Sequence, residues 1–172
     1  MGVAGNKLDI YDSAQKVKDF INQVFTEYDE ALPERQFVYV GEQPPHDCEQ
    51  LVIGFIQHYS GSPGAQSQEE SRCSEPRSAV FRVELVRSCA PGLVHVTNET
   101  TNRRYANRME APSSTEFEAD AKRKLIDATL LMEAGMRVAE TTNVIGGMAD
   151  VQVGPISGGF QAMILNVIMV VE

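Results

Sequence analysis

MADVQVGPISGGFQAMILNVIMVVE, residues 148–172, is the stretch that decides the fold of this chain. It holds two β-rich runs, Asp150–Val153 and Phe160–Val171, separated by a segment whose glycines and proline can turn the chain back. This pattern predicts a C-terminal β-hairpin. The second run is apolar on both of its alternating faces, so as a strand it needs cover on both sides. Either the chain's own helices or another copy of the chain must supply that cover.

Length and charge set broad limits on the function. The 172 residues predict one domain, residues 1–172. A net charge of −9 argues against wrapping nucleic acid or lying on an anionic membrane, but it allows DNA to pass an acidic wall without sticking. No apolar run has the length of a membrane helix and the first residues lack a signal-peptide pattern, so we expect a soluble protein made in the cytosol. The three widely spaced cysteines predict reduced thiols.

Two segments carry apolar residues at helical spacing. The first predicts an amphipathic helix from Asp9 to Tyr28, with a stripe made of Ile10, Ala14, Val17, Ile21, Val24 and Tyr28. The second continues to about Val138 or Ala139, and its start matches a capping box of Ser113 with Glu116 or of Thr115 with Glu118. Its expected polar side carries Lys122, Arg123 and Lys124. Its expected apolar side consists of Phe117, Ala121, Leu125, Ala128, Leu131 or Met132, and Gly135.

Three further β-rich runs separate these helices: Gln36–Val40, Leu51–Tyr59, with Gly54 as a possible bulge, and Ala79–Arg87. In the last run Phe81, Val83 and Leu85 face one way, and Arg82 and Glu84 face the other, towards water or a partner. The polar segments 60–78 and 97–114 read as long loops. The order of elements predicts an α+β fold, an antiparallel or mixed β-sheet with the two main helices packed on one face.

Charged residues suggest a surface for self-association. A candidate basic patch on this acidic protein consists of Arg82, Arg87, Arg103, Arg104 and Arg108. Arg82 and Arg87 are expected on the outward face of their strand, although scattered solvated arginines are the alternative explanation. The candidate acidic interface residues are Glu69, Glu70 and Glu84. Opposite charges on two surfaces of one molecule suit head-to-tail assembly.

No set of residues predicts catalysis, a metal site or a cofactor. Residues 46–48 and His58 include metal-ligand types without the spacing of a metal site, and loop positions explain them more simply. Ser88-Cys89 lacks a nucleophile-elbow motif, and residues 154–159 lack the lysine and the following helix of a phosphate loop. We therefore expect no enzyme activity.

Several segments resemble small connector proteins of long-tailed bacteriophages. They are FVYV at 37–40, DCEQLVI at 47–53, VFRVELVR at 80–87, KLIDA at 124–128, and VQVGP with GGF between 151 and 160. Within that group the chain is most similar to tail terminators. The resemblance implies a structural virion protein at the head-proximal end of the tail, forming a ring, expected to be a hexamer, after synthesis in the host cytoplasm. Such a ring ends tail-tube polymerisation, joins the tube to the head-closure or connector protein, and leaves a channel for DNA.

Three alternatives stay open. A head-closure or adaptor ring of the same connector differs from a terminator only in its position in the particle. A small enzyme or ligand-binding domain would use the apolar strand to line a pocket. A non-viral adaptor would dimerise through an edge of its sheet. For a ring protein, we expect loops 60–78 and 97–114 to contact the tube or the neighbouring ring and to order on assembly.

Overall fold

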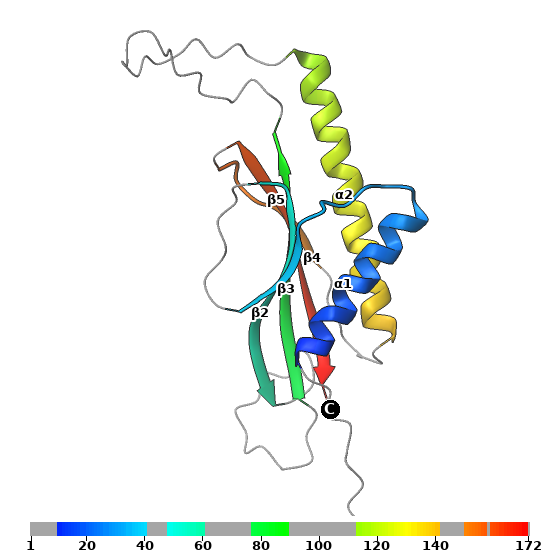
Figure 1. Cartoon of the computed structure of the whole chain (residues 1–172), viewed down its shortest axis with the longest axis vertical. Helices are drawn as coiled ribbons and strands as arrows, with labels where there is room; N and C mark the ends of the chain where they lie inside the picture. The colour runs from blue at the N-terminus through cyan, green and yellow to red at the C-terminus, as the bar shows by residue number, and fades with distance from the viewer. Residues whose placement is uncertain are drawn as a thin grey trace, which may run out of the picture.

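Two helices lie against one side of a five-stranded sheet (Figure 1). The computed structural model describes residues 10–40, 48–60, 77–89, 113–141, 150–157 and 159–171. The helices are α1 (Ile10–Glu27) and α2 (Ser114–Thr141). The strands are β1 (Gln36–Val40), β2 (Gln50–Ser60), β3 (Arg77–Ser88), β4 (Asp150–Val153) and β5 (Phe160–Val171). The predicted α+β class, with both helices on one face, is confirmed.

The strand order in the sheet is β1-β2-β3-β5-β4. β1 pairs with β2 in parallel, while the other neighbouring strands pair antiparallel, so the sheet is mixed. β3 and β5 are paired over their full lengths, from Arg77 with Val171 to Ser88 with Phe160. β5 therefore lies between two strands that precede it in the chain, and its apolar sequence on both faces fits this central place.

The predicted C-terminal hairpin is confirmed. β4 and β5 pair antiparallel, and the ladder continues past β4 through a hydrogen bond of 2.8 Å from Gly154 N to Ala162 O. The chain reverses between Ser157 and Phe160, whose backbones exchange hydrogen bonds of 2.8 and 3.0 Å. Gly159 lies in this turn with a φ of +84°, which glycine adopts without steric penalty.

β2 contains a bulge, but not at Gly54. The register with β3 shifts between Phe55 and Gln57, so the extra residue is Ile56. Gly54 stays in register opposite Arg82, and a Cβ there would make only ordinary contact, 3.4 Å from Arg82 O. The predicted irregularity is therefore present two residues later than the glycine suggested.

The hydrophobic core lies between the sheet and the helices. From β3 and β5 it receives Phe81, Val83, Leu85, Met163, Leu165, Val167 and Met169, none more than 3% exposed. From the helices it receives Val17, Ile21, Val24, Phe25, Leu130, Leu131, Ala134 and Val138. Each large apolar side chain buried in this way contributes about 1.5–3 kcal/mol by leaving water. This burial fixes which face of each strand meets the helices.

The C-terminal end of α1 differs from its prediction. Tyr28, expected to continue the apolar stripe, is 57% exposed, and Phe25 takes the last buried position. Asp29 adopts a φ of +56°, and Glu30 N donates to Phe25 O at 2.9 Å. These are the features of a left-handed C-cap, here without the usual glycine. The cap ends the helix before Tyr28 and leaves its ring at the surface.

The start of α2 uses the first of the two predicted capping boxes. Ser113 N donates to Glu116 Oε2 at 2.8 Å, and Glu116 N donates to Ser113 Oγ at 3.3 Å. The bonds that Ser113 N and Ser113 Oγ donate to the Glu116 carboxylate lower its pKa. The helix then continues to Thr141, beyond the predicted end.

The N-terminal half of α2 does not bury the side predicted to be apolar. Phe117 and Leu125 are 51% and 68% exposed. Lys124, expected on the polar side, is buried together with Asp127. Figure 1 shows that the first turns of α2 extend beyond the end of the sheet, so no strand lies beneath them.

Candidate interaction surfaces

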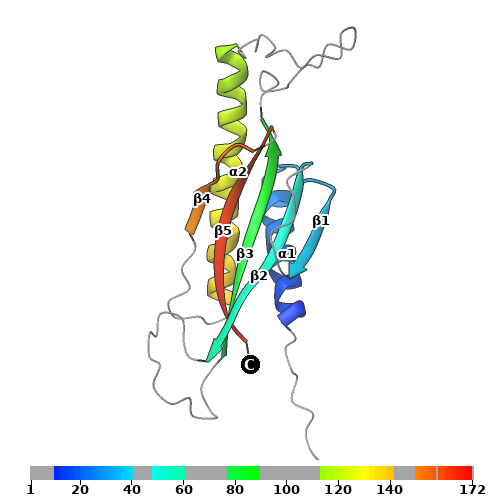
Figure 2. The same cartoon turned by 90° about the vertical axis from the view of Figure 1, so that its left-hand side faces the viewer.

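The outer face of the sheet is the face turned away from the helices, and it fronts the viewer in Figure 2. The register of β3 with β5 pairs Val80 with Ile168, Arg82 with Asn166, and Glu84 with Ile164. These six side chains share the outer face because strand residues alternate between faces. Within the described residues, no helix covers it (Figures 1 and 2).

Part of the outer face is exposed in a single copy. Val80, Ile164 and Ile168 are partly exposed, whereas Val86 and Ala162 are buried at 0% and 2% exposure. The expectation that half of β5 lacks cover therefore holds at Ile164 and Ile168 and is wrong at Ala162. The exposed apolar positions lie on both central strands, so they form one surface.

Arg82 and Glu84 are the charged residues of the outer face, and their predicted outward orientation is confirmed. Arg82 Nε lies 2.6 Å from Glu84 Oε1, and the two side chains are 37% and 5% exposed. The contact is an ion pair without hydrogen-bond geometry, so the buried Nε has no hydrogen-bond partner. Within one copy Arg82 is therefore held by a single ion pair, and part of its guanidinium stays exposed.

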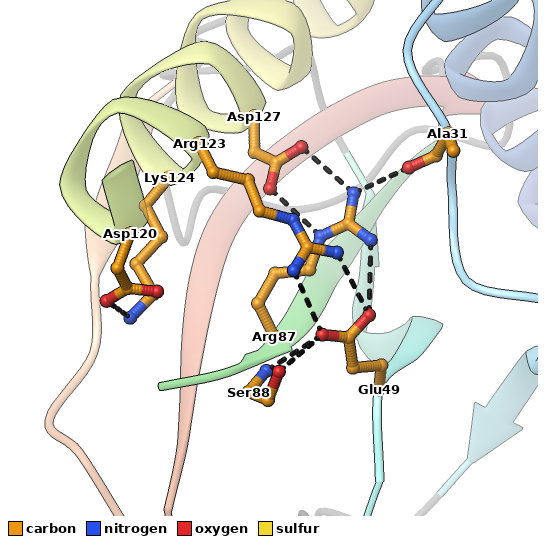
Figure 3. Close-up of polar contacts among 8 residues, drawn as sticks. All are labelled: Ala31, Glu49, Arg87, Ser88, Asp120, Arg123, Lys124 and Asp127. Carbon is orange, nitrogen blue, oxygen red and sulfur yellow. Dashed lines mark hydrogen bonds and ion pairs between the residues drawn. The ribbon is translucent and has the colours of Figure 1, made fainter. Parts of the chain in front are cut away.

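Arg87 lies on the opposite face, so its predicted outward orientation is wrong. Its side chain is 3% exposed and lies between the sheet and α2 (Figure 3). Nε and Nη2 donate to the two carboxylate oxygens of Asp127 at 2.9 and 3.0 Å, and Nη2 also donates to Ala31 O at 2.7 Å. This bidentate pairing suits the planar guanidinium. Buried in this way, Arg87 presents no charge to a partner.

Glu49 connects this buried pair to the surface (Figure 3). Its carboxylate accepts hydrogen bonds from Ser88 Oγ at 2.7 Å and Ser88 N at 3.1 Å. Arg123 donates to it at 3.1 and 3.3 Å, and Arg87 Nη1 lies 3.5 Å away. Partial burial raises the pKa of Glu49, but the Ser88 hydrogen bonds and Arg123 outweigh it and lower the pKa to about 2. Glu49 is therefore ionised at neutral pH.

We call Glu49, Arg87, Ser88, Asp127 and Arg123 the arginine cluster. It joins α2, the end of β3, the start of β2 and the segment after α1. All four carboxylate oxygens in it accept hydrogen bonds from arginine or serine, so the cluster acts as a structural tie. Sequence reasoning missed it, although strict alternation from Phe81 puts Arg87 on the helix side.

The other predicted interface residues, Arg103, Arg104, Arg108, Glu69 and Glu70, lie outside the described residues. So do His46 and Asp47.

A second exposed apolar surface lies on α2. Phe117, Ala121 and Leu125 are spaced four residues apart, and we call them the α2 stripe. Beside it, α2 and the end of α1 line an open groove of about 540 Å³. Its lining consists of Tyr28, Glu118, Ala121, Lys122, Leu125, Ile126, Thr129 and Leu130. Large exposed side chains gathered on one helix are typical of an interaction surface.

The charged residues of α2 form two groups, one on the side towards the core and one beside the α2 stripe. On the side towards the core, Asp120 pairs with Lys124 at 2.6 Å, and Asp127 and Arg123 belong to the arginine cluster. Glu118 and Lys122 border the α2 stripe, and neither forms an ion pair within the described part of the chain. The two charges beside the exposed apolar stripe are thus available to another molecule.

Within the described ranges, no group of His, Cys, Asp and Glu is arranged to hold a metal ion. None of the described helices combines the length and the apolar character needed to cross a membrane. No protein-family model matches the sequence, and no curated protein matches it.

Proposed function

We propose that this protein is a ring-forming structural subunit, a tail terminator of a long-tailed bacteriophage. The observation that carries the proposal is the outer face of the sheet. Its partly exposed Val80, Ile164 and Ile168 lie near Arg82, whose side chain is 37% exposed and pairs with Glu84. A neighbouring copy packed on this face would bury the apolar groups and pair with the exposed part of the guanidinium.

The arrangement of the two layers favours a ring over a dimer. The helices lie on one side of the molecule and the outer face lies on the other (Figure 1). When two different surfaces of identical molecules meet, the contact repeats from copy to copy and closes into a ring if the rotation permits. A net charge of −9 suits a channel through which DNA moves without binding.

A head-closure or adaptor ring of the same connector fits the same surfaces. The terminator is our first choice within that group, on the resemblance of the sequence as a whole. The two roles differ in the partner that the ring contacts: the tail tube for a terminator, and the portal side of the connector for an adaptor.

Two measurements test the proposal. Native mass spectrometry of the purified protein should show a single closed oligomer, expected to be a hexamer. Purified tail-tube protein, polymerised with and without this protein, should give shorter tubes with a cap at one end in negative-stain images. Ile164→Lys, which puts a charge on the outer face, serves as the control that should not cap. Tubes of unchanged length with the wild-type protein would overturn the terminator role.

A further inference from the structure

We infer that the copies assemble head to tail, with the α2 stripe of one copy packed on the outer face of the next. This inference rests on the proposed ring and names the two surfaces that form it. Phe117 and Leu125 of the stripe are 51% and 68% exposed. Packing a helix against an uncovered sheet face is the usual way for both elements to bury their apolar sides.

Both surfaces present apolar side chains that a neighbouring copy can cover. The α2 stripe presents large side chains around the small Ala121, and the outer face presents Val80, Ile164 and Ile168. The stripe lies on the exposed side of α2, whereas Lys124 and Asp127 of the same turns are buried towards β3. It is therefore free to contact a sheet in a neighbouring copy.

The charges also complement each other. Glu118 and Lys122 beside the stripe form no ion pair within the described residues. Arg82 and Glu84 on the outer face carry the matching opposite charges, and the Arg82 side chain is 37% exposed. A carboxylate from Glu118 of the neighbouring copy would pair with the exposed part of that guanidinium. Paired opposite charges at the rim of an apolar contact fix its register and orientation.

A two-fold contact between two α2 helices is the competing arrangement. An antiparallel pair centred on Ala121 would place Phe117 opposite Leu125 and would cover the stripe. It would leave the partly exposed Val80, Ile164 and Ile168 of the outer face uncovered. The head-to-tail contact accounts for both surfaces at once, so we favour it.

Cross-linking between differently substituted copies separates the two arrangements. One preparation carries Ala121→Cys, another carries Ile164→Cys, and wild-type protein controls for the native cysteines. Each is treated with a short bismaleimide, alone and as a mixture of the two. Head-to-tail packing predicts a cross-linked dimer band in the mixture only. Ala121 lies on the exposed side of α2, and Ile164 lies on the partly exposed outer face.

Each outcome of this experiment decides the inference. If the Ala121→Cys preparation alone gives a cross-linked dimer band, and the mixture gives no further band, the contact is two-fold and the inference is overturned. Rings in the wild-type protein without any new band in the mixture also overturn it, while the proposed ring function stands. Wild-type protein that stays monomeric with and without tail tubes overturns the proposed function and the inference together.

Charge reversal gives a second, independent readout of the same contact. Glu118→Arg alone and Arg82→Glu alone should each raise the protein concentration needed for half-maximal ring formation by roughly tenfold. The double variant should recover most of that loss, because the two reversed charges attract each other again. Thermal unfolding at low protein concentration checks that each monomer is folded. Losses that simply add in the double variant would contradict the predicted pairing of Glu118 with Arg82.

Discussion

Arg82 and Arg87 lie on the same strand, β3, but on opposite faces of the sheet, and they differ in nearly every physical respect. Arg87 is 3% exposed and pairs with Asp127 through two hydrogen bonds of 2.9 and 3.0 Å. Arg82 is 37% exposed, and its contact with Glu84 lacks hydrogen-bond geometry. On the side with helices the arginine is buried and paired through two hydrogen bonds, and on the outer side it is partly exposed and held by one ion pair. The proposal that another copy covers the outer face rests on this difference.

The largest expected effect distinguishes the two faces of β5. Leu165 is fully buried against the helices, and Ile164, its neighbour, is partly exposed on the outer face. Leu165→Asp should destabilise the monomer by more than about 4 kcal/mol, because it buries a charge without a partner. Circular dichroism should show loss of the folded state.

Ile164→Lys is the matched substitution on the other face. The residue lies opposite Glu84 in the register, so the new amine gains an acidic neighbour. We expect the monomer to stay folded and ring formation to be lost, as measured by unfolding and native mass spectrometry. A monomer destabilised as much as by Leu165→Asp would mean that the two faces of β5 are equally buried.

The two arginines provide the next comparison. Arg87→Ala should cost about 3–5 kcal/mol, since it leaves Asp127 as a buried, unpaired carboxylate. Arg82→Ala should change the free energy of unfolding by about 1 kcal/mol or less, since its partly exposed ion pair is weak. Urea unfolding at low protein concentration measures both. Equal costs for the two variants would contradict the assignment of Arg87 as a structural residue.

The smallest expected effect concerns pH and the arginine cluster. The pKa of Glu49 is lowered from 4.5 to about 2 on folding, so the unfolded chain binds more protons between these values. The stability that ionised Glu49 contributes is present above about pH 4.5 and is lost as the pH falls towards 2. The difference in unfolding free energy between wild type and Glu49→Gln should therefore shrink over that range, by on the order of 1 kcal/mol. A difference that does not change with pH would contradict this role.

The order of the elements was predictable because each has its own local pattern. The alternation of Phe81, Val83 and Leu85 identified the buried face of β3, and the Ser113–Glu116 box identified the start of α2. The orientation of Arg87 was not recognised, because a buried arginine depends on a carboxylate forty residues away that no local pattern announces.

For the α2 stripe, the sequence predicted burial and the structure shows exposure. Phe117, Ala121 and Leu125 have the spacing of a core-facing side, but in the tertiary arrangement they stay exposed. Lys124 and Asp127 are buried instead because Asp120 and Arg87 pair with them. Hydrophobic periodicity predicts that a helix is amphipathic, and it does not tell whether the apolar side meets the same chain or another one.

The place of β5 in the sheet also affects the order of events during synthesis. β5 is made after the other strands, yet it lies between β3 and β4. Until β5 emerges from the ribosome, the nascent β3 has an unpaired backbone edge and an unfilled apolar surface, a state prone to wrong pairing with other chains. Chaperone contacts during translation should therefore be concentrated on β3, and they should end once β5 has been inserted.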